Sequence, residues 1–239
     1  MQLYDMHSHI LPGIDDGCQT VEKSVEVLNA LKKQGINNVC FTPHFYTHHL
    51  SATDFLKKRD EAFEILKPHI PDGMRVLVGA EVYATRFMFN GDDFSGACLG
   101  KSRYIMTEHS YEARFTEHTM RYFQRLIEEY NMIPILPHFE RYITLMDDPS
   151  IIYELKDMGV IIQTNASSYS KDTSFFAKRK RIKLVKEGLV DIIGTDVHSL
   201  RRNTPEAYTE AIEYISQKAG QDVVEKMMSN AEEIFKAAL

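Results

Sequence analysis

The sequence predicts an α/β fold, a distorted TIM-like (β/α)7 barrel, on three observations. Short apolar runs alternate with amphipathic helical stretches along the whole chain. Five of these runs are continuously apolar, as in parallel strands that are covered on both faces. No linker or low-complexity segment separates the units, so residues 1–239 are expected to form a single domain. Seven such units favour a closed or nearly closed barrel over an open doubly wound sheet.

The expected elements follow one another in order. The first strand starts at Tyr4 and leads into a turn that ends at Gly17. Apolar residues at helical spacing, Val21, Val25 and Leu28 among them, indicate a helix that ends near 35. The other expected strands are 38–42, 75–80, 104–107, 133–136, 160–164 and 190–195. The other expected helices are 51–67, 120–130, 149–158, 175–187, one from about 205 and one from about 222, with an irregular stretch at 84–101.

Composition excludes several classes of protein. The net charge is −6, and basic residues are not concentrated enough to indicate a nucleic-acid partner. No apolar run reaches the roughly 18 residues of a membrane span, and the N-terminus does not resemble a signal peptide. Cys18, Cys40 and Cys98 are odd in number and scattered, which favours a reducing cytoplasm over a disulfide framework. None of them has an arginine six positions later, which excludes a cysteine-nucleophile tyrosine phosphatase.

Polar sequences follow nearly every expected strand. His7 and His9 stand two residues apart, a spacing that points both rings to one side of a strand. Asp15 and Asp16 follow in the next loop. In barrels of this class the chemistry lies at the C-terminal ends of the strands, so these side chains are expected to converge at one mouth. Mixed imidazole and carboxylate groups suit a borderline divalent metal.

Nine ionisable side chains make up the expected cluster. They are His7, His9, Asp16, His44, Glu81, Glu108, His138, Asp196 and His198. Taken singly, each has an ordinary explanation, because a lone histidine at a strand end is more often a core or loop residue than a ligand. Nine together would desolvate and repel one another without cations between them. The pattern therefore predicts a multinuclear metal site.

The remaining histidines are expected to have other roles. His69 and His118 lie in or near helices and are expected to be solvated. His109 neighbours Glu108 on a strand and would point the opposite way, where it is expected to be packed or hydrogen-bonded. His48 and His49 lie in a loop at the expected rim of the barrel. They would either contact the substrate or form an ordinary part of the loop.

A series of short motifs runs from the first strand towards the last helices. They are His7-Ser8-His9, Asp15-Asp16-Gly17, Pro43-His44, Gly79-Ala80-Glu81, Glu108, His138-Phe139-Glu140-Arg141-Tyr142 and Asp196-Val197-His198. The series resembles the PHP (polymerase and histidinol phosphatase) superfamily. Within it, the chain is similar to the bacterial manganese-dependent protein-tyrosine phosphatases of capsule and exopolysaccharide operons. Glu108 favours this branch, since histidinol phosphatases commonly have a histidine at that position.

The resemblance implies three divalent ions, with manganese first and iron or zinc as alternatives. The implied ligands, ion by ion, are His7, His9, Glu81 and Asp196; Glu81, Glu108 and His138; and Asp16, His44 and His198. Glu81 would bridge two ions, and Asp15 is the alternative to Asp16. Three divalent ions exceed the charge of the four carboxylates by two, which suits a phosphate dianion.

The implied activity is that of a metal-dependent protein-tyrosine phosphatase. A metal-activated hydroxide would hydrolyse phosphate monoesters, and the implied substrate is the tyrosine-rich tail of a bacterial tyrosine autokinase. Asp196 and Arg141 are expected to be catalytic residues. Arg141 is the expected phosphate clamp, and its alternative role is a salt bridge to a loop carboxylate. The family has a second arginine five residues after the final histidine. Here that position is Asn203, so the neighbouring Arg202 is expected to supply the charge.

Two other readings stay open at this point. A histidinol phosphatase or another small-molecule phosphoesterase would use the same site with alkyl phosphates. A non-hydrolytic regulatory or polymerase-associated domain would keep the fold, although such domains commonly lose several ligands, whereas all nine are present here. Neither nucleic acid nor membrane insertion is expected.

Overall fold

The computed structural model describes residues 1–91 and 93–239, and the strand pairs in these residues are parallel. The strands form a three-stranded sheet in the order β1-β2-β4 and a six-stranded sheet in the order β3-β5-β6-β7-β8-β9. Their bounds are β1 Leu3–Asp5, β2 Ile36–Phe41, β3 His44–Tyr46, β4 Arg75–Val78, β5 Glu81–Tyr83, β6 Tyr104–Glu108, β7 Ile133–Leu136, β8 Ile161–Asn165 and β9 Ile192–Gly194.

Two of the expected strands are each divided between the sheets. β2 leads into β3 across Thr42 and Pro43, and β4 leads into β5 across Gly79 and Ala80. Pro43 has no N–H to donate to a sheet ladder, which favours a break there. Gly79 lies so close to Leu99 that a Cβ would be 2.7 Å from its Cδ2 atom. With each divided pair counted once, the described strands occupy the seven expected positions.

The sheets do not close into one continuous barrel. β1 and β9 approach each other, but the backbone hydrogen bonds between their neighbourhoods are few: the N–H of Met6 donates to Ile193 O at 3.3 Å, that of Asp196 to His7 O at 2.7 Å and that of His9 to Val197 O at 2.9 Å. An isolated parallel bridge joins Ser8 and Val197. The parallel α/β class is therefore confirmed, whereas a closed barrel is not observed. Asp196 interrupts the extended chain with a φ of 55°, so β9 ends before a full ladder forms.

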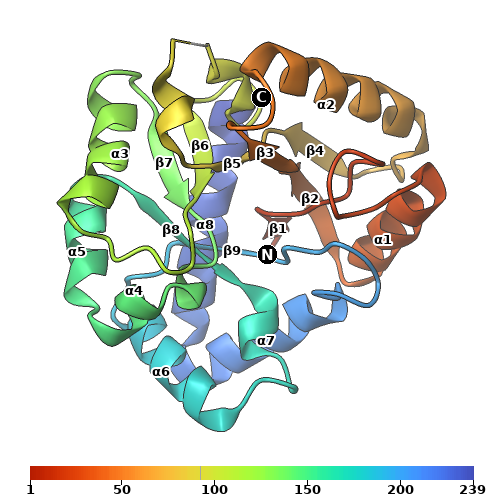
Figure 1. The fold of residues 1–239 in the computed structure, drawn as a ribbon. Coiled ribbons are helices and arrows are strands. Elements are labelled where there is room, and N and C mark those ends of the chain that lie inside the picture. Colours follow the sequence, from red (N-terminus) through yellow and green to blue (C-terminus); the bar gives the residue numbers. More distant parts are fainter. Residues whose placement is uncertain (92) are drawn as a thin grey trace.

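Helices surround the strands on the outside (Figure 1). Their bounds are α1 Val21–Lys33, α2 Ala52–Leu66, α3 Glu117–Glu128, α4 Ile143–Asp147, α5 Ser150–Asp157, α6 Phe175–Lys186, α7 Glu206–Ala219 and α8 Gln221–Ala238. Short 3₁₀ turns are η1 Lys67–His69, η2 Arg86–Phe89, η3 Ser95–Ala97, η4 Phe139–Arg141 and η5 Ala166–Tyr169. The sequence did not predict α4, and the stretch expected to be irregular contains η2 and η3.

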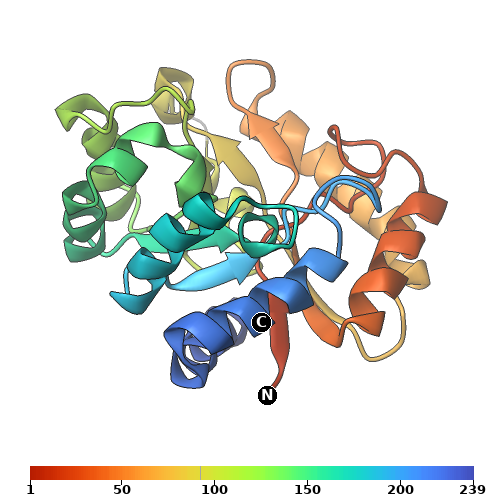
Figure 2. The same cartoon turned by 90° about the horizontal axis from the view of Figure 1, so that it is seen from below.

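The core lies between these helices and the strands. Figure 2 shows α7 and α8 together on one side of the strands, next to β1. Phe235 of α8 meets Tyr4 of β1 edge to face, with ring centroids 5.3 Å apart, and both residues are buried. Cys18, Cys40 and Cys98 are buried and unpaired, in agreement with the absence of a disulfide framework. In the described part of the chain, no helix has the length and apolar character needed to cross a membrane.

Candidate metal centre

All nine side chains predicted as ligands meet in one place. They form four overlapping groups in which the ligand atoms lie within 4.8 Å of one another. The groups are His9, Asp16, His44 and His198; His7, Glu81 and His138; His7, His9 and Asp196; and His44, Glu81 and Glu108. The residues come from β3, β5 and β6 and from the segments after β1, β7 and β9. Each group has the mixed imidazole and carboxylate character that suits a divalent ion.

Glu81, the first residue of β5, is the centre of this cluster. One carboxylate oxygen, Oε1, lies 2.8 Å from Nε2 of His138. The other, Oε2, lies 3.2 Å from Nε2 of His7, 3.3 Å from Nε2 of His9 and 3.0 Å from Nδ1 of His44. The side chain is fully buried, so one carboxylate is shared among four imidazoles.

The carboxylates have different proton affinities. Burial would raise the pKa of Glu81, but the charge of His7 and the hydrogen bond from His138 outweigh it and hold that pKa well below its usual range. For Asp196 the same balance, with His7, His9 and Arg141 opposing burial, also lowers the pKa. Burial, followed by repulsion from Glu81, raises the pKa of Glu108. Such crowding of charge is what bound cations relieve.

Asp15 and Asp16 have different contacts. Asp15 is buried, with Oδ2 2.7 Å from Nδ1 of His9, and accepts from the backbone N–H of His44 at 3.0 Å. Its contact with His9 orients that ring with Nε2 towards the cluster. Asp16 instead turns Oδ1 towards Nε2 of His198, at 3.3 Å. The geometry therefore favours Asp16 over Asp15 as the ligand.

Asp196 uses its two oxygens differently. Oδ1 faces the histidines, 3.3 Å from Nε2 of His9. Oδ2 accepts three hydrogen bonds on its other side, from Asn165 at 2.8 Å, Asn203 at 3.1 Å and Arg141 at 2.5 Å. A carboxylate with one oxygen fixed in this way presents the other in a single orientation.

Both predicted arginines lie at the rim. Arg141 contacts Asp196 and also donates to the hydroxyl of Tyr111 at 3.1 Å, so the expected alternative role, a salt bridge, is present in the structure. Arg202 is exposed and donates to Oδ2 of Asp16 at 2.6 Å. Asn203 stands where the family arginine was expected, with a φ of 53°, and its amide donates to the backbone oxygen of Asp196 at 2.8 Å.

Gln163 of β8 is a site residue that sequence reasoning missed. It is fully buried, and its Oε1 accepts from the backbone N–H of His138 at 2.7 Å and lies 3.3 Å from Nδ1 of His7. Its Nε2 donates to Oδ1 of Asn165 at 3.0 Å. A glutamine that directly follows the apolar run Val160-Ile161-Ile162 in a predicted strand was the signal that could have revealed it.

Buried polar atoms at the cluster fit metal ligation. Oε2 of Glu81 and Nε2 of His198 are among the few buried side-chain atoms of the described residues that lack a hydrogen-bond partner. Buried polar groups are normally paired, so unpaired atoms of this kind within one cluster suit the ligation of cations. The residues present therefore fit divalent metal ions.

The other histidines lie apart from these groups. His109 is buried against Phe115 and Phe123, and burial lowers its pKa to about 3, in agreement with the expected packing role. The rings of His48 and His49 are tilted against each other with their centroids 4.1 Å apart, and both approach the ring of Tyr46 at the rim.

Gly194 allows His7 to approach β9, and replacing it tests the packing of the site. A Cβ there would lie 2.6 Å from Cβ of His7 and 2.9 Å from its backbone N. We expect Gly194→Ala to displace His7, to cost about 1–3 kcal/mol in the free energy of unfolding, and to lower the number of ions bound. Urea unfolding and elemental analysis measure these effects. The matched control is Gly96→Ala, whose Cβ would meet only the flexible end of Leu56, at 2.7 Å. Normal metal binding by Gly194→Ala would contradict the prediction.

Comparison with known proteins identifies the family. The model of the family described as "Capsular polysaccharide synthesis, CpsB/CapC" matches residues 3–236. The chain belongs to this family. The resemblance expected from the motifs is thereby confirmed.

Curated relatives extend over nearly the whole chain. The tyrosine-protein phosphatase CpsB of Streptococcus pneumoniae is 29% identical over 91% of this chain and 91% of its own length. The tyrosine-protein phosphatase YwqE of Bacillus subtilis is 26% identical over 96% of this chain and 90% of its own.

Solved structures show the same fold. A chain from the structures of YwqE of Bacillus subtilis and CpsB of Streptococcus pneumoniae, described as metal-dependent tyrosine phosphatases, aligns with a TM-score of 0.83 at 24% identity, covering 99% of this chain and 96% of that one. A histidinol phosphate phosphatase from Lactococcus lactis aligns with a TM-score of 0.58 at 15% identity, covering 91% and 94%. At these identities the likeness concerns the fold alone.

Proposed function

We propose that this member of the CpsB/CapC family is a metal-dependent tyrosine-protein phosphatase. The observation that carries the proposal is the convergence of nine ionisable side chains, Glu81 among them, in four overlapping groups whose ligand atoms lie close enough to hold several cations. The curated relatives over the whole chain are named tyrosine-protein phosphatases. The chain also has no cysteine with an arginine six positions later, so its own residues favour metal-dependent over cysteine-dependent hydrolysis.

Three divalent ions, manganese foremost, are the proposed cofactors. We assign the ligands, ion by ion, as His7, His9, Glu81 and Asp196; Glu81, Glu108 and His138; and Asp16, His44 and His198. The contacts of Glu81 with four imidazoles support its bridging role. Bound ions would lower the pKa of the attacking water and neutralise the phosphoryl oxygens. Histidine and carboxylate ligands without thiolate suit manganese or iron as well as zinc.

The protein's own groups would orient the phosphate ester. Arg141 stands at the edge of the cluster with its guanidinium beside Asp196, where its charge and planar donors suit two phosphate oxygens. Asp196 is fixed by three donors and so presents Oδ1 in one direction. Arg202 is proposed to add positive charge at the Asp16 side of the rim. Tyr46, Tyr83 and Tyr111 offer aromatic surface for the phenyl ring of the substrate.

The proposed physiological substrate is a phosphotyrosine protein, foremost the tyrosine-rich tail of a bacterial tyrosine autokinase in capsule or exopolysaccharide regulation. The family description, capsular polysaccharide synthesis, supports this assignment. A cytoplasmic location agrees with three unpaired cysteines.

Metal removal and reconstitution test the function. The protein is stripped with a chelator, reloaded with manganese and assayed on a phosphotyrosine peptide and on histidinol phosphate. We expect peptide hydrolysis to disappear on stripping, to return with manganese and to be absent in Asp196→Ala, because the nucleophile depends on the ions. Metal content is measured on every sample. Hydrolysis of histidinol phosphate alone would reject the proposal and assign the site to small-molecule phosphoesters.

A further inference from the structure

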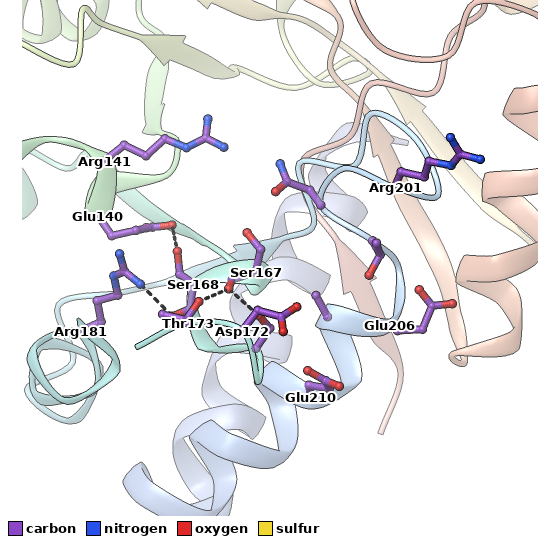
Figure 3. Close-up of a pocket in the computed structure, with 14 residues that line it drawn as sticks. Glu140, Arg141, Ser167, Ser168, Asp172, Thr173, Arg181, Arg201, Glu206 and Glu210 are labelled. Atoms are coloured by element: carbon purple, nitrogen blue, oxygen red, sulfur yellow. Dashed lines mark hydrogen bonds between the residues drawn. The ribbon is translucent and has the colours of Figure 1, made fainter. Parts of the chain in front are cut away.

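A polar groove of about 540 Å³ adjoins the metal centre (Figure 3). We call it the serine groove, because three serines form part of its lining. Ser167 and Ser168 belong to η5, and Ser170 is the residue after η5. Its other lining residues come from η4, from the segment between η5 and α6, from α6, from the loop that precedes α7 and from the first half of α7. Arg141 and Arg201 stand at its upper edge in Figure 3, and Glu210 stands at the opposite end.

The groove begins where the proposed reaction takes place. Arg141 lines the groove and contacts Asp196 at 2.5 Å, and Asn203 lines it and contacts the same carboxylate at 3.1 Å. A phosphotyrosine bound beside Arg141 would therefore have the serine groove as its neighbour. The residues before or after that tyrosine are the parts of a protein substrate that would reach it.

The interior of the groove is pre-formed. The backbone oxygen of Ser167 accepts from the hydroxyls of Ser170 at 2.9 Å and Thr173 at 2.7 Å. Ser168 donates to Glu140 at 2.7 Å and accepts at its backbone oxygen from Arg181 at 2.9 Å. Because these groups are already bonded to one another, little ordering would be needed when a peptide binds.

The groove is lined by charged residues of both signs. Arg201, at the end near the metal centre, is exposed and forms no ion pair with any described residue, so its charge is available to a ligand. Asp172, Glu206 and Glu210 also line the groove, and of these Glu210 lies farthest from Arg201 in Figure 3. Glu210 is paired with Lys171 at 2.9 Å. An acidic side chain near the phosphotyrosine of a peptide would complement the charge of Arg201, whereas a basic side chain there would be repelled by it.

We propose that the serine groove binds the segment next to the phosphotyrosine of a protein substrate, and that Arg201 selects an acidic residue in that segment. This inference rests on the proposed phosphatase function and adds a preference within it. Small aryl phosphates do not extend into the groove. Arg201 therefore affects the preference among peptides and not the hydrolysis common to all phosphotyrosine esters.

Charge reversal on both partners tests the inference. Two phosphotyrosine peptides are compared, one with glutamates and one with lysines on both sides of the phosphotyrosine, together with phenyl phosphate. Arg201→Glu is expected to lower kcat/KM for the glutamate peptide by about fivefold to tenfold, mainly through KM, because a favourable charge pair becomes a repulsive one. The same variant is expected to raise kcat/KM for the lysine peptide, so that the preference between the two peptides inverts. Arg179→Glu, the same change at an exposed position of α6 outside the groove, is the matched control.

Each outcome decides the inference. Inversion of the peptide preference in Arg201→Glu but not in Arg179→Glu supports it. An equal loss on both peptides and phenyl phosphate overturns it, because Arg201 would then act on every ester alike. An unchanged preference also overturns it. Failure of the unaltered, manganese-loaded protein to hydrolyse any phosphotyrosine substrate is a separate result that rejects the phosphatase function itself.

Discussion

Replacing Glu81 with glutamine is expected to remove phosphatase activity and to lower the number of ions bound per chain. The amide has the same shape as the carboxylate but no charge, and its nitrogen cannot accept a metal. Since Glu81 contacts four imidazoles of the cluster, one substitution would affect at least two of the overlapping ligand groups. Loss of a shared ligand in a metal-assisted hydrolysis should lower kcat by about a thousandfold or more.

Three measurements separate this effect from unfolding. Elemental analysis gives the ions per chain, thermal unfolding with and without manganese gives the stabilisation by metal, and turnover gives the rate. An ion at 100 times its Kd stabilises the folded state by about 2.7 kcal/mol, and Glu81→Gln should lose much of that difference. Glu112→Gln removes the same charge from an exposed position after β6 and should behave like the unaltered protein. Undiminished metal stabilisation in Glu81→Gln would show that Glu81 is not a ligand.

The fold was predictable as far as local pattern determines it. Apolar runs and helical stripes gave the order of strands and helices, because burial imposes those periods directly on the sequence. Closure was not predictable, since it depends on how β1 and β9 meet. At that meeting Asp196 has a φ of 55°, and the weak preference of aspartate for positive φ could not have located it among the many aspartates of the sequence. His7 and His9 likewise lie beyond the end of β1, not on the strand as expected.

The site was predictable where chemistry restricts the residue type. Histidines and carboxylates at strand ends indicate metal binding by their residue types alone, and the structure brings all nine together. The supporting residues are less visible, because asparagine and glutamine serve many purposes and their roles depend on contacts distant in sequence. Gln163 and His7 are 156 residues apart. The backbone of His138, with a φ of 35°, is another feature that only the folded chain shows.

Hydrogen bonds of known direction fix the orientation of Gln163. The backbone N–H of His138 can only donate, so the atom 2.7 Å from it must be the amide oxygen of Gln163. The amide nitrogen then donates to Oδ1 of Asn165, and the nitrogen of Asn165 donates to Asp196 at 2.8 Å. It follows that Nδ1 of His7, 3.3 Å from the same amide oxygen, carries the hydrogen and leaves Nε2 free. One chain of amides thus orients two proposed ligands of the same ion.

Gln163→Leu is expected to weaken metal binding by about 10- to 100-fold, the usual effect of removing a group that orients a metal ligand. Leucine has a similar volume but cannot accept a hydrogen bond, so the tautomer of His7 would no longer be fixed. Gln163→Glu keeps the acceptor for both His7 and His138 but loses the donor to Asn165 and to the backbone oxygen of Thr164. Its metal affinity should therefore lie between those of the unaltered protein and Gln163→Leu. Chelator competition measures the affinities. In the zinc-loaded protein, the nitrogen chemical shifts of the His7 ring report which nitrogen carries the hydrogen. Equal losses in both variants, with the tautomer unchanged, would mean that Gln163 only fills space, because a positioning role requires the acceptor that glutamate retains and leucine lacks.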